Sequence, residues 1–131
     1  MSYRNTAQRR RILEVLQSTD THPTASRVFD EVRQHIPSIS LGTVYRNLNV
    51  LVSQGTIQKI SCEDAEDRYD AITTPHIHFY CRNCGCVSDV QDDQAYRDLA
   101  KLVDGLDEDI ESYSLICYGK CPRCGTQSTC N

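Results

Sequence analysis

The chain has 131 residues, enough for one ordinary domain or two very small ones, and its formal net charge of −4 argues against nucleic-acid binding by the chain taken as a whole. No apolar stretch approaches the roughly 18 residues of a membrane-spanning helix, and the N-terminus lacks the apolar run of a signal peptide, so a cytoplasmic location is expected. In that compartment the eight cysteines are expected to bind metal or carry out redox chemistry rather than to form disulfides.

The two halves of the chain differ in charge. Residues 1–60 hold eight basic and four acidic side chains, a net charge of +4, whereas residues 61–131 hold six basic and fourteen acidic ones, a net charge of −8. Such an asymmetry indicates two modules, of which the first is the candidate for an anionic partner.

Three helices are predicted in the first module. They are expected to follow the N-cap residues Thr6, Thr24 and Ser40, and each carries apolar residues at spacings of three and four. Gly55 is expected to end the third helix, because glycine favours the left-handed backbone found just after a helix. Two strands, at residues 56–62 and 67–72, then surround the acidic tip EDAED. Three helices followed by a β-hairpin form the order of a winged helix-turn-helix.

The second module has a different pattern. It predicts a strand at 77–81, a cysteine turn, a strand at 86–90, a helix at 94–106, a strand at 112–118 and a second cysteine turn. The sequence therefore predicts an α+β protein with a winged-helix DNA-binding domain at residues 1–69, a hinge at 70–74 and a small α/β domain at 75–131.

DNA binding would use the third helix, because the second helix of a helix-turn-helix enters the major groove. The candidates for base and phosphate contacts on this helix are Thr43, Tyr45, Arg46 and Asn49, and Arg9 on the first helix is a candidate for a phosphate contact. The alternative is an ordinary helical bundle with a solvated charged face. The acidic hairpin tip would repel phosphate and favours that alternative.

Two C-x-x-C pairs predict a metal site in the second module. Cys81 and Cys84 form the first pair, and Cys121 and Cys124 form the second. Four thiolates from two tight turns close a tetrahedral shell around zinc and leave no open position, so the expected role is structural. The alternative is a pair of thioredoxin-like redox motifs.

Four further cysteines, Cys62, Cys86, Cys117 and Cys130, are interpreted as spare thiols. Cys86 lies two residues after Cys84 and is a possible competing ligand, whereas Cys117 is expected to be buried in a strand.

Histidines indicate a second metal site. His76 and His78 alternate along a predicted strand and therefore face the same side. Asp70, Asp89 on the next strand and His22 in the first module are candidates to complete the site, although each taken alone is more typical of a surface or capping residue. Three imidazoles and two carboxylates would suit Fe(II) or Mn(II) better than zinc.

Taken together, these motifs resemble the ferric uptake regulator superfamily of metal-dependent bacterial repressors over nearly the whole chain. The resemblance rests on HPTASRVFDEVRQHIPSISLGTVYRNLNVLVSQGTI, DRYD, HIHFYCRNCG and CPRCG, which occur in the family's order. Within the family, the chain is most similar to the peroxide-responsive branch, because that branch has aspartate where iron and zinc sensors typically have glutamate, at Asp89. The resemblance implies regulatory metal ligands at His22, Asp70, His76, His78 and Asp89.

The resemblance also implies a function. The chain would be a homodimer, joined through the second module, that represses transcription by binding a palindromic operator when Fe(II) or Mn(II) is bound. With iron, hydrogen peroxide would oxidise a ligand histidine, His22 or His78, and release the DNA, while zinc on the four cysteines would stay inert. The chain would not be an enzyme.

Three alternatives remain at this stage. One is an iron- or manganese-responsive repressor without peroxide sensing, which shares every motif. Another is a non-haem iron enzyme built on His76, His78 and a carboxylate, although five protein ligands leave little room for a substrate. The third is a zinc-ribbon interaction protein with no role in DNA binding.

Overall fold

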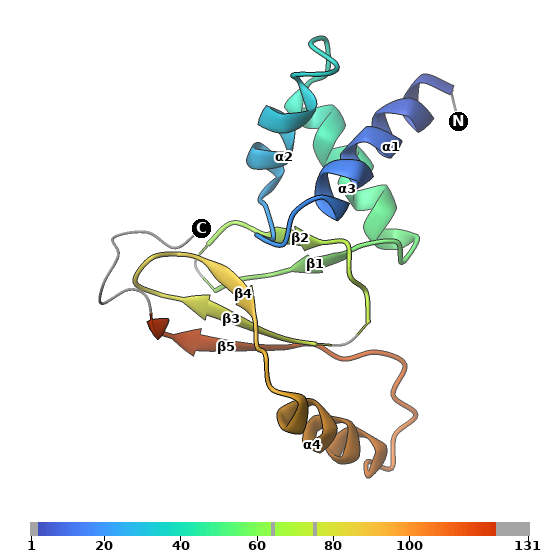
Figure 1. Cartoon of the computed structure of the whole chain (residues 1–131). Coiled ribbons are helices and arrows are strands. Elements are labelled where there is room, and N and C mark those ends of the chain that lie inside the picture. Colours follow the sequence, from blue (N-terminus) through green and yellow to red (C-terminus); the bar gives the residue numbers. More distant parts are fainter. Residues whose placement is uncertain (1–2, 64, 75, 123–131) are drawn as a thin grey trace. The chain divides into compact units, whose positions relative to one another are not determined.

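The computed structural model of the chain describes residues 3–63, 65–74 and 76–122, and the side chains from residue 7 onward in these ranges. The chain divides into two compact units, Met1–Thr73 and Thr74–Asn131. Figure 1 shows their elements in colours that run from blue to red along the chain. Cys124 and Cys130 lie outside the described residues.

The first unit consists of three helices and a two-stranded antiparallel sheet. In chain order its elements are α1 (Tyr3–Gln17), α2 (Ala25–Val32), α3 (Leu41–Ser53), β1 (Gln58–Ile60) and β2 (Arg68–Asp70). The predicted N-caps of α2 and α3 are confirmed: the Thr24 side chain accepts a hydrogen bond from the Arg27 amide at 3.3 Å, and the Ser40 side chain accepts one from the Thr43 amide at 3.1 Å.

The ends of α1 and α3 differ in how well local sequence predicts them. Gly55 follows α3 with a φ of 75° and donates to the Val52 carbonyl, while the Thr56 amide donates to the Leu51 carbonyl, as in a Schellman motif. The predicted start of α1 is wrong, because the helix begins at Tyr3 and already contains Thr6. Residues 3–5 include neither proline nor glycine, so the sequence there does not oppose an earlier helical turn.

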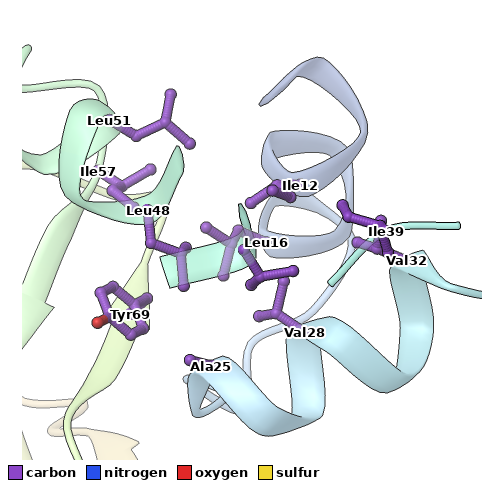
Figure 2. Close-up of a cluster of buried hydrophobic side chains, with 11 residues drawn as sticks. Ile12, Leu16, Ala25, Val28, Val32, Ile39, Leu48, Leu51, Ile57 and Tyr69 are labelled. Atoms are coloured by element: carbon purple, nitrogen blue, oxygen red, sulfur yellow. The ribbon is translucent and has the colours of Figure 1, made fainter. Parts of the chain in front are cut away.

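A single hydrophobic core holds the first unit together. Ile12 and Leu16 of α1, Val28 of α2 and Leu48 of α3 meet Tyr69 of β2 in this core (Figure 2). Each fully buried aliphatic side chain contributes about 1.5–3 kcal/mol by leaving water. The strand β2, which carries Arg68 and Asp70, is therefore held against the helices.

A buried thiol and a buried tyrosine hydroxyl in the first unit are expected to make its stability sensitive to alkaline pH. Burial raises the pKa of the Cys62 thiol, an effect that Arg68 opposes, and burial also raises the pKa of the Tyr69 hydroxyl. Since the folded pKa values lie above the unfolded ones, the stabilisation is fully present below the unfolded values, about 8.5 for the thiol and about 10 for tyrosine, and it is lost as the pH rises through the folded values.

We therefore expect the urea midpoint of helix unfolding to fall between about pH 7.5 and about pH 10. The Cys62→Ala variant should lose less stability over this range than the wild type, by about 1.4 kcal/mol for each unit by which folding raises the thiol pKa. Cys117→Ser, at an exposed thiol, is the control and should behave as the wild type. An equal loss in Cys62→Ala and the wild type would show that the thiol does not contribute.

The second unit contains a three-stranded sheet and one helix. Its elements are β3 (Ile77–Cys81), β4 (Val87–Asp89), α4 (Asp93–Asp104) and β5 (Leu115–Gly119), and the strand order is β4-β3-β5. β3 pairs antiparallel with β4 and parallel with β5, and α4 lies in the connection between β4 and β5. The register places His78 opposite Asp89.

The prediction that Cys117 is buried is wrong. Its side chain is exposed, because β5 is an edge strand of a small sheet and α4 buries none of its residues in the described part of the unit. Among the described residues of both units, no helix has the length and apolar character needed to cross a membrane.

Candidate metal sites and nucleic-acid interface

His22 and Asp70 form a buried pair in the first unit. The His22 Nε2 atom lies 3.2 Å from the Asp70 Oδ2 atom, and the two side chains are 2% and 8% exposed. The other carboxylate oxygen of Asp70 accepts a hydrogen bond from the Ile72 amide at 2.9 Å, which fixes the orientation of the carboxylate. A buried imidazole beside a buried carboxylate is a donor pair suited to a divalent metal ion.

The backbone of His22 is strained. Its φ of 55° is the one positive φ outside glycine in the described residues. Left-handed backbone at a residue with a Cβ atom destabilises the chain by about 1–3 kcal/mol, and the following Pro23 further restricts it. Sequence reasoning missed this conformation, because HPT carries no signal for a left-handed residue.

His76, His78 and Asp89 form a second cluster, within the second unit. The Nε2 atoms of His76 and His78 lie 3.1 Å and 3.6 Å from the Asp89 Oδ1 atom, and one donor atom of each residue lies within 4.8 Å of the others. The rings of His76 and His78 are 4.2 Å apart between centroids, and the His76 Nδ1 atom lies 2.8 Å from the Thr74 carbonyl oxygen. His78 lies on β3 opposite Asp89 of β4, and His76 lies immediately before β3, two residues from His78.

Three of the four predicted zinc ligands lie close together in the second unit. The Cys84 and Cys121 sulfur atoms are 3.8 Å apart, and the Cys81 sulfur belongs to the same cluster. The amides of Cys84 and Cys121 each donate to the Cys81 sulfur at 3.4 Å. Such donors favour the ionised thiolate that a metal requires. Gly85, with a φ of 79°, completes the turn between the strands, and the fourth cysteine, Cys124, is not among the described residues.

The side chains predicted to contact DNA extend along α3. Tyr45, Arg46 and Asn49 are exposed, and Thr43 is half-buried. The Arg46 guanidinium donates to the Thr43 hydroxyl at 3.0 Å, which limits its rotamers before any partner binds. These residues offer hydroxyl, amide and guanidinium groups of the kinds that contact phosphates and base edges.

Arg9 has an intramolecular contact that the sequence did not indicate. Its Nε atom donates to the Asn47 side-chain oxygen at 3.1 Å, and the Asn47 amide nitrogen donates to the Thr43 carbonyl at 3.0 Å. Asn47 is 4% exposed and was missed by sequence reasoning, because a buried asparagine in a helix has no periodic signature. Arg9 therefore links α1 to the helix predicted to read DNA.

The sequence profile of the Ferric uptake regulator family matches residues 1–118. The chain belongs to this family. Among its curated relatives, the Peroxide-responsive repressor PerR of Staphylococcus aureus (strain USA300) is 34% identical over 122 residues, which span 92% of this chain and 82% of that protein. The ferric uptake regulator family is one of transcriptional regulators rather than enzymes, as the sequence predicted.

Solved structures of the ferric uptake regulator family agree with the fold. The peroxide stress regulator of Campylobacter jejuni has a TM-score of 0.79 and 31% identity, and the match covers 92% of this chain and 91% of that chain. The ferric uptake regulator Fur of Helicobacter pylori, described as having three functional metal binding sites, has a TM-score of 0.78 and 22% identity. The match covers 94% of this chain and 83% of that chain, and at this identity it supports the fold alone.

Proposed function

We propose that this member of the ferric uptake regulator family is a metal-dependent transcriptional repressor that senses hydrogen peroxide. The observation that supports it best is the pair of nitrogen- and oxygen-donor clusters, His22 with Asp70 in one unit and His76 and His78 with Asp89 in the other. Similarity to relatives named peroxide-responsive repressor and peroxide stress regulator supports hydrogen peroxide as the signal.

The regulatory metal, in this proposal, is one Fe(II) or Mn(II) ion held by both clusters. Two imidazoles and a carboxylate within one unit already leave positions open for further ligands, and the donor set contains no thiolate that would favour zinc. An ion held by donors from both units would couple metal binding to the arrangement of the units. Metal and DNA would then stabilise each other's binding by the same factor.

Peroxide sensing would proceed by loss of a ligand histidine. An Fe(II) ion held by these histidines and carboxylates would supply the redox chemistry that activates hydrogen peroxide beside the ring. In the overall change, one oxygen atom of peroxide would be added to a carbon of the imidazole, and the other would leave as water. His22 and His78 are each 3% exposed, so an oxidant produced in bulk water would reach other side chains first. One oxygen atom added to either imidazole would weaken its donor nitrogen, and the repressor would lose its metal and release DNA. Manganese, which does not readily reduce peroxide, would support repression without sensing.

Zinc at Cys81, Cys84, Cys121 and Cys124 would have a structural role. The sulfur-donor chemistry of the three described ligands and the two amide donors on the Cys81 sulfur support this assignment.

A homodimer that binds a palindromic operator in the cytoplasm would complete the repressor. The second unit exposes large apolar side chains that a partner subunit would cover, namely Leu102, Leu106, Ile110 and Leu115. A two-fold dimer would present two copies of α3 to successive major grooves. The acidic residues after β1 would be repelled by phosphates, so we expect them to lie away from the DNA backbone.

The function is tested by selecting duplexes from a random pool with the zinc-loaded protein and Mn(II). We expect enriched palindromes whose complexes dissociate when the regulatory metal is chelated and form again when Mn(II) is restored. The variant Arg46→Ala should lose binding, whereas Arg33→Ala, at the exposed residue that follows α2, should retain it. Binding that ignores metal, or no enrichment at all, would contradict the proposal.

A repressor that responds to iron or manganese without sensing peroxide would give the same DNA-binding result. Treating the Fe(II) form with peroxide separates the two, because only the peroxide sensor should gain oxygen on a ligand histidine. The non-haem iron enzyme is the less favoured alternative, and the family assignment argues against it.

A further inference from the structure

We propose that Arg68 is a positioning residue for the regulatory metal, because it holds the strained backbone of His22 in the conformation that presents the imidazole to Asp70. The inference rests on the proposed function, since it assumes that His22 and Asp70 bind the metal. It concerns contacts within the first unit alone.

The strain at His22 requires contacts that maintain it. A residue with a Cβ atom leaves the left-handed region readily unless its neighbours fix the adjoining peptide groups. The imidazole itself is buried against Asp70, and that contact acts on the ring rather than on the adjoining peptide group. Other contacts must therefore hold the carbonyl of His22.

Arg68 provides this contact from β2. Its Nη1 atom donates to the His22 carbonyl oxygen at 3.2 Å, and hydrogen bonds from a charged donor are stronger than those from a neutral one. The next residue of β2, Tyr69, donates its amide to the Pro23 carbonyl at 3.0 Å, and Arg68 pairs with Thr24 in an isolated β-bridge.

Three successive residues of β2 thus hold the segment around His22. Arg68 contacts the His22 carbonyl, Tyr69 contacts the residue after it, and Asp70 contacts the imidazole. Because Tyr69 is 2% exposed in the core, this strand is a rigid support. The distance between the His22 Nε2 atom and the Asp70 Oδ2 atom then depends on the side chain of Arg68 as well as on the backbone.

A different role for Arg68 would be direct contact with DNA, since β1 and β2 form the predicted wing. A guanidinium that binds a phosphate contributes to the salt dependence of DNA binding and leaves metal affinity unchanged. A guanidinium that positions His22 instead contributes to metal affinity, even when no DNA is present. The two roles can be separated by measuring metal affinity in the absence of DNA.

The test compares Arg68→Met with Arg27→Met in the full-length, zinc-loaded protein. Arg27 is an exposed arginine of α2 and serves as the matched control. We expect Arg68→Met to bind Mn(II) about 10-fold to 100-fold more weakly than the wild type, the range found when supports of metal ligands are removed, with Arg27→Met unchanged. In the metal-free protein, NMR signals of the His22 ring and amide should move in Arg68→Met while those of His76 and His78 stay in place.

A second variant guards against misfolding. Arg68→Lys keeps a charged donor on a shorter arm and should have an intermediate affinity for Mn(II). Equal Mn(II) affinity in Arg68→Met and the wild type, with an unmoved His22 signal, would overturn the inference. Failure of the wild type itself to bind Mn(II) would instead overturn the proposed function.

Discussion

Replacing Cys81 with serine is expected to remove tightly bound zinc and to abolish the ordered structure of the second unit. In that unit the described apolar core is small: Ile77, Cys81 and Val87 are buried, and α4 buries none of its residues. A unit of this size needs a further constraint, and the proposed four-thiolate zinc site would supply one by tying β3 to the segment after β5.

The expected effect is large because the free energy of zinc binding also contributes to the free energy of folding. Structural zinc sites in small peptides contribute about 10 kcal/mol or more at neutral pH, which equals or exceeds the whole stability of many domains. Cys81 has the central place in the cluster, since its sulfur accepts both the Cys84 and the Cys121 amides. Its loss would leave the partly buried Cys84 and Cys121 amides without their sulfur acceptor as well as an incomplete metal shell.

Zinc content and thermal unfolding of the full chain measure this effect. Cys117→Ser is the matched control, because it changes an exposed thiol of the same unit and should keep one zinc ion per chain and the melting temperature of the wild type. A Cys81→Ser protein that retained zinc through chelation and melted as the wild type does would show that the cluster is not structural.

Much of the first unit was predictable because its signals are local. The caps at Thr24 and Ser40 and the left-handed Gly55 each follow from the chemistry of one or two residues beside a helix. In the second unit, the two-residue spacing of His76 and His78 predicted that they face the same side, and the hairpin between β3 and β4 puts Asp89 opposite His78.

The features that the sequence did not reveal depend on contacts far apart in the chain. The hydrogen bond from Arg9 to Asn47 joins residues 38 positions apart, and the one from Arg68 to His22 joins residues 46 positions apart. No local pattern distinguishes these arginines from solvated ones. The exposure of Cys117 was missed for a related reason, since alternation in a strand does not say whether another layer covers that face.

Treating the Fe(II) form with hydrogen peroxide is expected to abolish DNA binding irreversibly, and this is the second large effect. The change needs both the metal and a ligand imidazole beside it, so the Mn(II) form should keep its DNA under the same treatment. Because His22 and His78 are buried, oxidation confined to them indicates an oxidant produced at the site. Addition of fresh Mn(II) should not restore binding, since the donor nitrogen of the oxidised ring is weakened.

Asp89→Glu offers a matched variant for this effect. The substitution keeps a carboxylate opposite His78 but lengthens its arm, so metal-dependent DNA binding should persist while peroxide sensitivity falls. Equal peroxide sensitivity in the variant and the wild type would remove the argument that aspartate at this position favours sensing.

The most direct test of the central claim is peptide mass spectrometry of the Fe(II)-loaded, zinc-replete protein before and after peroxide, with the Mn(II)-loaded protein treated in parallel. We expect one added oxygen atom on a histidine of the peptide that contains His22 or of the peptide that contains His76 and His78, in the Fe(II) form alone. Oxidation confined to cysteines, or found equally in the Mn(II) form, would contradict it.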